Sequence, residues 1–174
     1  MTVRRFEAFD DNYIWGIEEK SNFLIVDPGD PEPIIEFLRE NKTLKLAGIL
    51  ITHHHFDHVG GINKLTNLND LSIYCNDNIS FCDDRKCNSL PIIGPFGFEK
   101  YGVNNFVKEK DSFFFGKQRF TVIEIPGHTN DHIGFLCEHN DLNKNISLFC
   151  GDTLFAAGCG RILGGKAEDL YASL

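Results

Sequence analysis

The chain has 174 residues, 42% of them hydrophobic, and a formal net charge of −8 at pH 7. This size and apolar content suit one domain with a hydrophobic core, and the acidic balance argues against a protein that binds nucleic acid or an anionic membrane. The sequence has no apolar run near the roughly 20 residues that span a bilayer and no recognisable secretory signal. Its six cysteines include no CxxC pair, which is typical of free thiols in a reducing compartment, so we expect a cytoplasmic protein.

The first half of the chain alternates short strands with short helical segments. Asp27-Pro28-Gly29 is a turn signal, and the apolar residues at 34, 35 and 38 recur at helical spacing after an opening proline. The run at 46–52 is continuously apolar, as in a strand buried on both faces. We therefore expect strands over 3–9, 12–18, 22–27 and 46–52, a helix over 31–42, and a short helix within 59–70.

The second half is richer in strand signals. Residues 76–102 contain many Asn, Asp, Gly and Pro residues without a clear period, which indicates a long excursion over the surface. The segment 111–127 is typical of a hairpin that turns at Gly116-Lys117. We expect further strands over 71–75, 132–138 and 146–152, and the opening of a helix at 167–174. Strands with helices at intervals predict a layered α/β domain.

Three of these apolar strands are followed at once by side chains that can bind a metal. The stretch ITHHHFDHVGG at 51–61 follows the first strand, His128 follows the second and Asp152 follows the third. Loops at one edge of a sheet can bring such side chains together, and imidazole and carboxylate suit zinc, iron or manganese. The sequence therefore predicts a metal site.

The histidine cluster itself supports this interpretation. In an extended backbone His53 and His55 point the same way, and the chain can then turn so that Asp57 and His58 face a second point nearby. A purely structural role is a poor explanation, because four imidazoles would repel one another when protonated and would contribute little to a core. Two neighbouring groups of metal ligands fit the spacing better.

The motifs T-H-x-H-x-D-H, P-G-H-T and G-D-T, in this order, resemble the metallo-β-lactamase superfamily. Longer stretches are similar to glyoxalase II within it: DDNYIWGI, VDPGD, THHHFDHVGGI, PGHTNDHIGF and LFCGDTLFAAGCGRILGG. The resemblance runs over nearly the whole chain. It implies a four-layer αββα sandwich over residues 1–174 that lacks the family's C-terminal helical region.

The resemblance also implies a set of site residues and two divalent ions, zinc first, with iron or manganese as alternatives. The implied ligands of the first metal are His53, His55 and His128, those of the second are Asp57 and His58, and Asp152 bridges the two. Asp57 and Asp152 are also the implied catalytic residues, because they hold the metals that activate a hydroxide between them.

Further residues match positions near the site. By the resemblance, His132 is a packed and hydrogen-bonded strand residue and not a ligand. Asp27 matches a family position near the metals, where it either supports the metal ligands or serves only in the turn. Arg161 stands where the family places a basic residue against glutathione, and a solvated loop charge is the alternative interpretation. Leu163 replaces an aromatic hydroxyl found in some members.

The implied activity is hydrolysis of a small-molecule glutathione thioester. An S-(2-hydroxyacyl)glutathione such as S-lactoylglutathione would give glutathione and lactate, a step of methylglyoxal detoxification. A hydroxide held between two cations is a strong nucleophile near neutral pH, and the cations stabilise the tetrahedral oxyanion. The thiolate leaves without a general acid, because its conjugate acid has a pKa of about 8.5.

The chain departs from the family at its end. No histidine follows His139, although the family supplies one more ligand of the second metal and then a basic helical region that grips glutathione. We therefore expect a domain that is incomplete at its C-terminal end, with a second metal site one ligand short. A shortened sheet would also expose an edge strand and apolar surface.

Several interpretations stay open at this point. The chain is a fragment of a full hydrolase, a minimal hydrolase with looser substrate choice and one firmly held metal, or a metal-binding remnant with little or no turnover. Another hydrolase of the superfamily, acting on lactones or phosphoesters, is a further alternative. The stretch GDTLFAAGCGR argues against that last one, because it resembles the glyoxalase II branch specifically.

Overall fold

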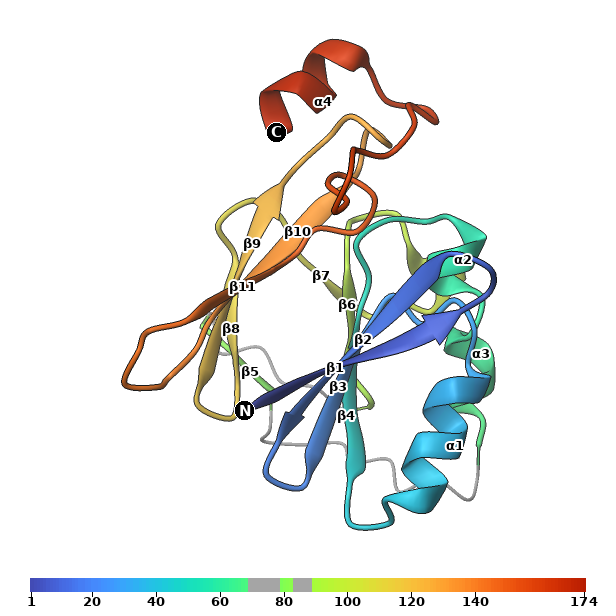
Figure 1. The fold of residues 1–174 in the computed structure, drawn as a ribbon, viewed down its shortest axis with the longest axis vertical. Coiled ribbons are helices and arrows are strands. Elements are labelled where there is room, and N and C mark those ends of the chain that lie inside the picture. Colours follow the sequence, from blue (N-terminus) through green and yellow to red (C-terminus); the bar gives the residue numbers. More distant parts are fainter. Residues whose placement is uncertain (69–78, 83–88) are drawn as a thin grey trace.

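The computed structural model describes residues 1–68, 79–82 and 89–174. These residues form two β-sheets that lie face to face, with helices beside them (Figure 1). The layered α/β fold that the sequence predicts is therefore confirmed.

The first sheet, sheet A, has six strands in the order β1-β2-β3-β4-β6-β7. The first three strands pair antiparallel, and from β3 onward the neighbours pair in parallel. Its strands are β1 (Thr2–Ala8), β2 (Asn12–Glu19), β3 (Asn22–Val26), β4 (Lys45–Leu50), β6 (Ile92–Gly94) and β7 (Asn105–Phe106).

The second sheet, sheet B, has five antiparallel strands in the order β11-β10-β9-β8-β5. They are β5 (Ile79–Phe81), β8 (Ser112–Phe115), β9 (Gln118–Glu124), β10 (Ile133–Glu138) and β11 (Ile146–Phe149). The turn between β8 and β9 falls at Gly116 and Lys117, as predicted, and Gly116 supplies the positive φ of 59° that this tight turn needs. Among the described strands β11 forms one edge of sheet B, where Ile146 and Leu148 are exposed.

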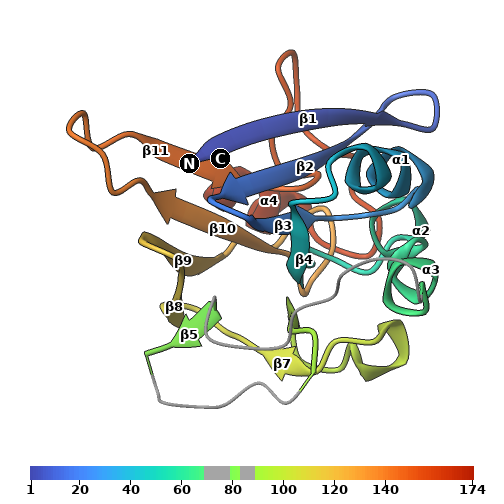
Figure 2. The ribbon, with the colours of Figure 1, turned by 90° about the horizontal axis from the view of Figure 1, so that it is seen from below.

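Three helices lie on the face of sheet A that points away from sheet B (Figures 1 and 2). They are α1 (Glu32–Glu40), α2 (Phe56–Val59) and α3 (Ile62–Thr66). The fourth helix, α4 (Ala167–Ser173), lies beyond the ends of β9 and β10. It is held there by a hydrogen bond from Ser173 Oγ to the Pro126 carbonyl (2.7 Å).

The central strands β3 and β4 of sheet A are buried on both faces, and β3 shows why. Phe23 and Ile25 point into the apolar layer under the helices, while Leu24 and Val26 point into the layer between the sheets. Alternate residues of a strand face opposite sides of its sheet, so a strand between two apolar layers must be apolar throughout. The continuous apolar runs in the sequence carry this signal.

One expectation for the middle of the chain was wrong. Within the predicted surface excursion over 76–102, the described residues include β5, β6 and a 3-10 turn, η1 (Glu99–Tyr101). Ile93 of β6 is fully buried beside β4, and Phe98 packs in the core. Both strands have three residues, which is too short for a periodic pattern to appear. The predicted strand over 71–75 lies outside the described residues.

The remaining expected elements are confirmed with small shifts at their ends, among them the helix that opens near residue 167. Over the described ranges, none of the helices is long and apolar enough for a membrane crossing.

Candidate metal centre

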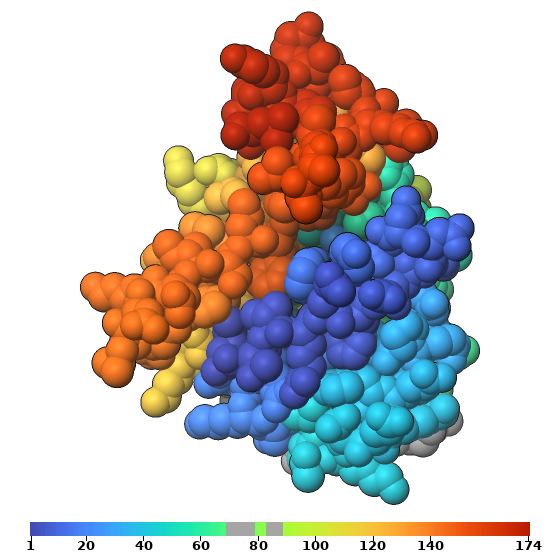
Figure 3. Space-filling view, viewed as in Figure 1, coloured from blue at the N-terminus to red at the C-terminus, as the bar shows by residue number. Residues whose placement is uncertain are grey.

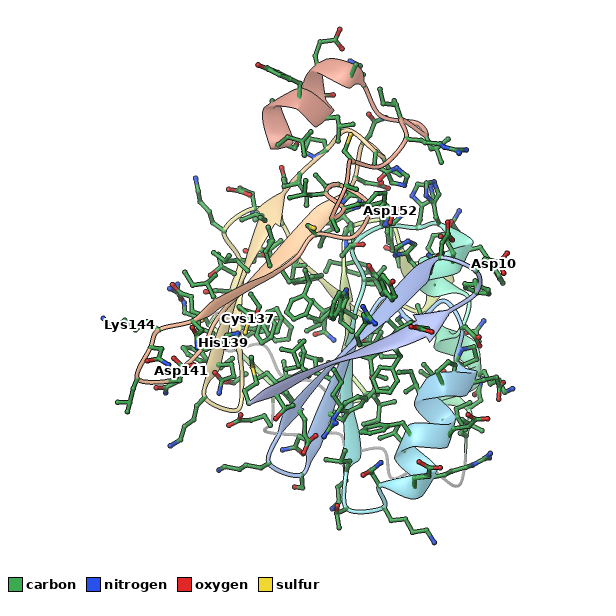
Figure 4. All side chains as sticks on the ribbon, in the orientation of Figure 1. Asp10, Cys137, His139, Asp141, Lys144 and Asp152 are labelled. Carbon is green, nitrogen blue, oxygen red and sulfur yellow. The ribbon has the colours of Figure 1, made fainter. Side chains whose placement is uncertain are left out.

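The strand ends that carry metal-competent side chains meet at one end of the two sheets. His53 follows β4 of sheet A, whereas His128 follows β9 and Asp152 follows β11 of sheet B. A backbone hydrogen bond joins the sheets here, from the Ile133 N–H to the Thr52 carbonyl (3.0 Å). Asp152 is labelled at this end in Figure 4. On the face seen in Figure 3, the surface dips between the blue β1–β2 hairpin and the orange-red segment after β11.

Three imidazoles form the first group of candidate ligands. The Nε2 atom of His53 lies 3.1 Å from Nδ1 of His55, which lies 2.9 Å from Nε2 of His128. Nitrogens bound to one tetrahedral zinc at about 2.0 Å are roughly 3.3 Å apart. The three ring nitrogens are therefore spaced as ligands of a single ion.

The second group consists of Asp57, His58 and Asp152, whose ligand atoms lie within 4.8 Å of one another. The Nε2 atom of His58 is buried and has no hydrogen-bond partner within the described part of the chain. It lies 3.1 Å from Asp152 Oδ1 and 3.5 Å from Asp57 Oδ2. A buried ring nitrogen without a hydrogen bond, facing two carboxylates, has the surroundings that a bound cation would satisfy.

Asp152 faces both groups. Its Oδ1 atom lies near His58 of the second group, and its Oδ2 atom lies 3.5 Å from Nε2 of His128 in the first group. One carboxylate thus presents one oxygen to each set of ligands, which is the arrangement that a bridging ligand needs.

Asp27 organises the histidines from behind. Its carboxylate is buried and accepts hydrogen bonds from the Thr52 backbone N–H (2.8 Å), the Thr52 hydroxyl (2.7 Å) and His58 Nδ1 (3.0 Å). Because the Thr52 hydroxyl donates to Asp27, its oxygen accepts from Nδ1 of His53 (3.0 Å). In the neutral, metal-binding form of both imidazoles the network places the proton on Nδ1, so that Nε2 is left to bind a metal.

His128 is held by the loop that follows Asp152. Its Nδ1 donates to the Arg161 carbonyl (2.5 Å), and its own carbonyl accepts from the Leu163 N–H (2.8 Å). The backbone of this loop passes close to Asp152 only because residue 160 is a glycine: a Cβ atom on Gly160 would lie 1.9 Å from the Asp152 carbonyl oxygen. A backbone carbonyl therefore fixes the tautomer of the third histidine, with Nε2 again free.

Two imidazoles of the first group, His53 and His55, have lowered pKa values. Burial lowers the pKa of His53 far below its ordinary value, and neighbouring imidazoles lower it further. The pKa of His55 is lowered as well, first by burial and then by His128. Metal binding requires neutral imidazole, so these shifts keep the two rings in the binding state at neutral pH.

The pKa of His58, in the second group, is raised instead of lowered. Burial would lower its pKa, but the charge of Asp27 and the contacts with Asp152 and Asp57 outweigh burial and raise the pKa to about 12. Burial would also raise the pKa of Asp152, yet the contact with His58 brings it below its ordinary value. This pocket of carboxylates therefore favours a positive charge, which a divalent cation could supply in place of the proton.

The other residues singled out in the sequence have distinct places. His132 is buried, stacks on His53 and accepts the Asp152 N–H at Nε2 (3.2 Å), in agreement with a packed, hydrogen-bonded role. His54, within the histidine run, stacks on Tyr101, and its Nδ1 atom lies 3.4 Å from Asp131 Oδ2. The Arg161 side chain is exposed, and Leu163 is exposed as well.

Sequence reasoning missed three contributors to the site. The Thr52 hydroxyl donates to Asp27 and accepts from His53. The Arg161 carbonyl accepts from His128. Asn12 Nδ2 donates to Asp57 Oδ2 (2.7 Å). The Thr before the first histidine was a visible signal. The other two were not, since a carbonyl is common to every residue and Asn12 is separated from Asp57 by 45 positions.

Comparisons with known proteins show the family of the chain. The sequence matches the metallo-beta-lactamase superfamily over residues 10–174. It is 40% identical to the hydroxyacylglutathione hydrolase of Chromohalobacter salexigens, which it matches over 100% of this chain and 60% of that protein. The chain spans 59% of the similarly named protein of Photobacterium profundum, at 37% identity. It thus covers about three-fifths of the length of these curated relatives.

Solved structures show the same fold. The crystal structure of BLEG-1 B3 metallo-beta-lactamase gives a TM-score of 0.75 at 21% identity, over 99% of this chain and 83% of that chain. The structure of ETHE1 from Myxococcus xanthus gives 0.73 at 24% identity, over 99% and 68% respectively.

Proposed function

Because the chain belongs to the metallo-beta-lactamase superfamily, we propose that it is a metal-dependent hydrolase of the glyoxalase II type. The proposed reaction is hydrolysis of S-(2-hydroxyacyl)glutathione, with S-lactoylglutathione as the leading substrate, to glutathione and a 2-hydroxy acid. The observation that carries the proposal is Asp152, which presents one carboxylate oxygen to each of two groups of ligands. The names of the curated relatives support the choice of substrate.

The chemistry of the two groups fits two divalent ions, zinc first, with iron or manganese as alternatives. The first would be held by His53, His55 and His128, the second by Asp57 and His58, and Asp152 would bridge them. The second set contains three protein donors, one fewer than the family pattern. When bound, such ions would polarise a substrate carbonyl and activate a water molecule as the nucleophile.

The residues of this chain have definable tasks in that reaction. Asp27 and Thr52 would keep His53 and His58 in the tautomer with the proton on Nδ1. The Arg161 carbonyl would do the same for His128. We assign the Arg161 side chain to the glutathione carboxylates, because it is an exposed cation on the loop that holds His128. Since the leaving thiol has a pKa of about 8.5, no residue has to protonate it.

The wider role follows from the same proposal. Hydrolysis of S-lactoylglutathione would place the protein in methylglyoxal detoxification, and the cytoplasmic location expected from the sequence stays a prediction. All four cysteines in the described ranges are free thiols, Cys82, Cys137, Cys150 and Cys159, as a reducing compartment would allow.

The test is thiol release from S-lactoylglutathione by the purified chain after zinc loading, together with a count of bound metal. We expect turnover that His53→Ala abolishes, because the variant removes a ligand of the first metal. His139→Ala is the matched control: His139 is labelled at the opposite end of sheet B from Asp152 in Figure 4, so turnover should persist.

A folded, metal-loaded chain that releases no thiol would contradict the proposal and favour a metal-binding remnant. Turnover of a lactone or phosphoester without turnover of the thioester would favour another hydrolase of the superfamily. Both substrates are therefore included beside the thioester in the same assay.

A further inference from the structure

The tip of the β1–β2 hairpin reaches the candidate metal centre through one side chain. Asn12 is the first residue of β2, and its backbone pairs with Ala8 across the hairpin. Its Nδ2 atom donates a hydrogen bond to Asp57 Oδ2, with a donor–acceptor distance of 2.7 Å. This is a charge-assisted bond to a carboxylate, which is stronger than a bond between neutral groups.

Asp57 needs such a partner more than the other candidate ligands do. His53 and His58 are buried and receive support from Asp27 and Thr52. The Asp57 side chain, by contrast, is 42% exposed. Its backbone is fixed by close packing, since a Cβ on Gly29 would lie 1.8 Å from the Asp57 carbonyl oxygen. That contact leaves the carboxylate free to rotate about the side-chain bonds.

A second contact holds the hairpin against the same short helix. The ring of Phe9 in the β1–β2 turn lies 6.4 Å from the ring of Phe56, the residue before Asp57. The hairpin thus meets α2 at two successive positions, once through an aromatic pair and once through the Asn12 amide. Both contacts bring the hairpin tip to the segment that carries Asp57.

We propose that Asn12 is a positioning residue for the second metal site, whose side-chain amide fixes the Asp57 carboxylate in the orientation that binds the ion. The inference rests on the two-metal centre of the proposed function and assigns a residue beyond its ligands. A carboxylate oxygen has two lone pairs, so Asp57 can accept the Asn12 amide and still bind a cation. Removing such a supporting partner typically weakens metal binding about 10- to 100-fold.

The experiment follows stepwise zinc binding to the metal-stripped protein by competition with a chromophoric chelator. It compares wild type, Asn12→Ala, Asp57→Ala and the control Asn143→Ala. Asn143 is an exposed residue between Asp141 and Lys144, which Figure 4 places at the far end of sheet B. Circular dichroism and thermal unfolding of each metal-stripped variant check that the fold is kept.

We expect Asp57→Ala to remove one binding step, Asn12→Ala to weaken that same step by roughly 10-fold, and Asn143→Ala to change neither step. If Asp57→Ala removes a step while Asn12→Ala binds both ions with wild-type affinity, the positioning role is wrong and the proposed function stands. If Asp57→Ala alters no step, the second metal site is wrong and the inference falls with it. If Asn12→Ala lowers thermal stability and weakens both steps equally, Asn12 has only a structural role, and the inference is overturned.

Discussion

Asp27 and His58 form a buried pair in which Oδ2 of the carboxylate lies 3.0 Å from Nδ1 of the imidazole. The same carboxylate also accepts the Thr52 hydroxyl, which is bonded in turn to His53. Since His53 belongs to one group of candidate ligands and His58 to the other, a single carboxylate orients an imidazole in each. The properties of the two groups are therefore coupled through Asp27.

Replacing Asp27 by asparagine tests this coupling. The Asp27→Asn variant would keep the size of the side chain but lose the charge and one acceptor, so neither imidazole would be held as firmly in its tautomer. We expect zinc affinity to fall about 10- to 100-fold, measured by chelator competition. Asp10→Asn, at the exposed hairpin tip, is the matched control and should bind zinc normally. Wild-type affinity in the Asp27→Asn variant would show that the pair only shapes the turn.

Proton release on metal binding follows from the opposite pKa shifts of His53 and His58. His58, with its pKa raised to about 12, holds a proton at pH 7, whereas the lowered pKa of His53 leaves that ring neutral. Zinc binding at the second group should therefore release about one proton from His58. Calorimetry in two buffers of different ionisation enthalpy measures this number. His58→Gln should lower it by about one, and an unchanged count would refute the assignment.

In the metal-stripped protein His58 stabilises the fold, and this stabilisation depends on pH. The pKa of His58 is higher in the folded protein than its ordinary value of 6.5. The contribution of His58 to the free energy of unfolding is therefore full below pH 6.5 and is lost as the pH rises toward 12. Denaturant unfolding of metal-stripped wild type should therefore lose stability with rising pH relative to His58→Gln. A parallel pH dependence of the two proteins would contradict the raised pKa.

Gly160 offers a steric test of the loop that holds His128. In Gly160→Ala the new Cβ would meet the Asp152 carbonyl oxygen at 1.9 Å, so the loop must move and the bond from His128 to the Arg161 carbonyl must lengthen. We expect about 10-fold weaker zinc binding. Gly158→Ala is a close control, because a Cβ there has nothing within 4 Å. Equal affinities in the two variants would show that His128 does not depend on this loop.

Cys137 gives a prediction away from the metal centre. Burial in the layer between the sheets raises the pKa of its thiol to about 12 from an ordinary value of 9.0. An acid with a raised pKa in the folded state destabilises the fold as the pH exceeds the unfolded pKa, so the cost begins near pH 9 and grows toward 12. At pH 10.5 it should be about 2 kcal/mol.

The check on Cys137 is a comparison of urea unfolding at pH 8 and pH 10.5. Cys137→Ala is expected to lose less stability than wild type between these pH values, even though its stability at pH 8 is lower because a buried atom has been removed. Cys159→Ala, at an exposed free thiol, should follow wild type. If all three proteins lose the same stability, the thiol ionises as freely in the folded state as in the unfolded chain.

Much of the fold could be predicted from the chain because its signals are local. Continuous apolar runs predict strands buried on both faces, and the strand-like runs on either side of Gly116-Lys117 predict the β8–β9 hairpin. The strands β5 and β6 escaped prediction because three residues carry too little periodicity. Their place in the sheets is decided by neighbours far away in sequence.

The sequence by itself determined the candidate ligands, since imidazoles and carboxylates directly after apolar strands are visible in the order of residues. Only the tertiary structure decided how those ligands are held. The Asn12 amide reaches Asp57 across 45 positions, and the carbonyl that fixes His128 belongs to Arg161, 33 positions away. Hydrogen bonds of this kind depend on strand register and on the packing of the two sheets, and a backbone carbonyl has no residue type by which a sequence could reveal it.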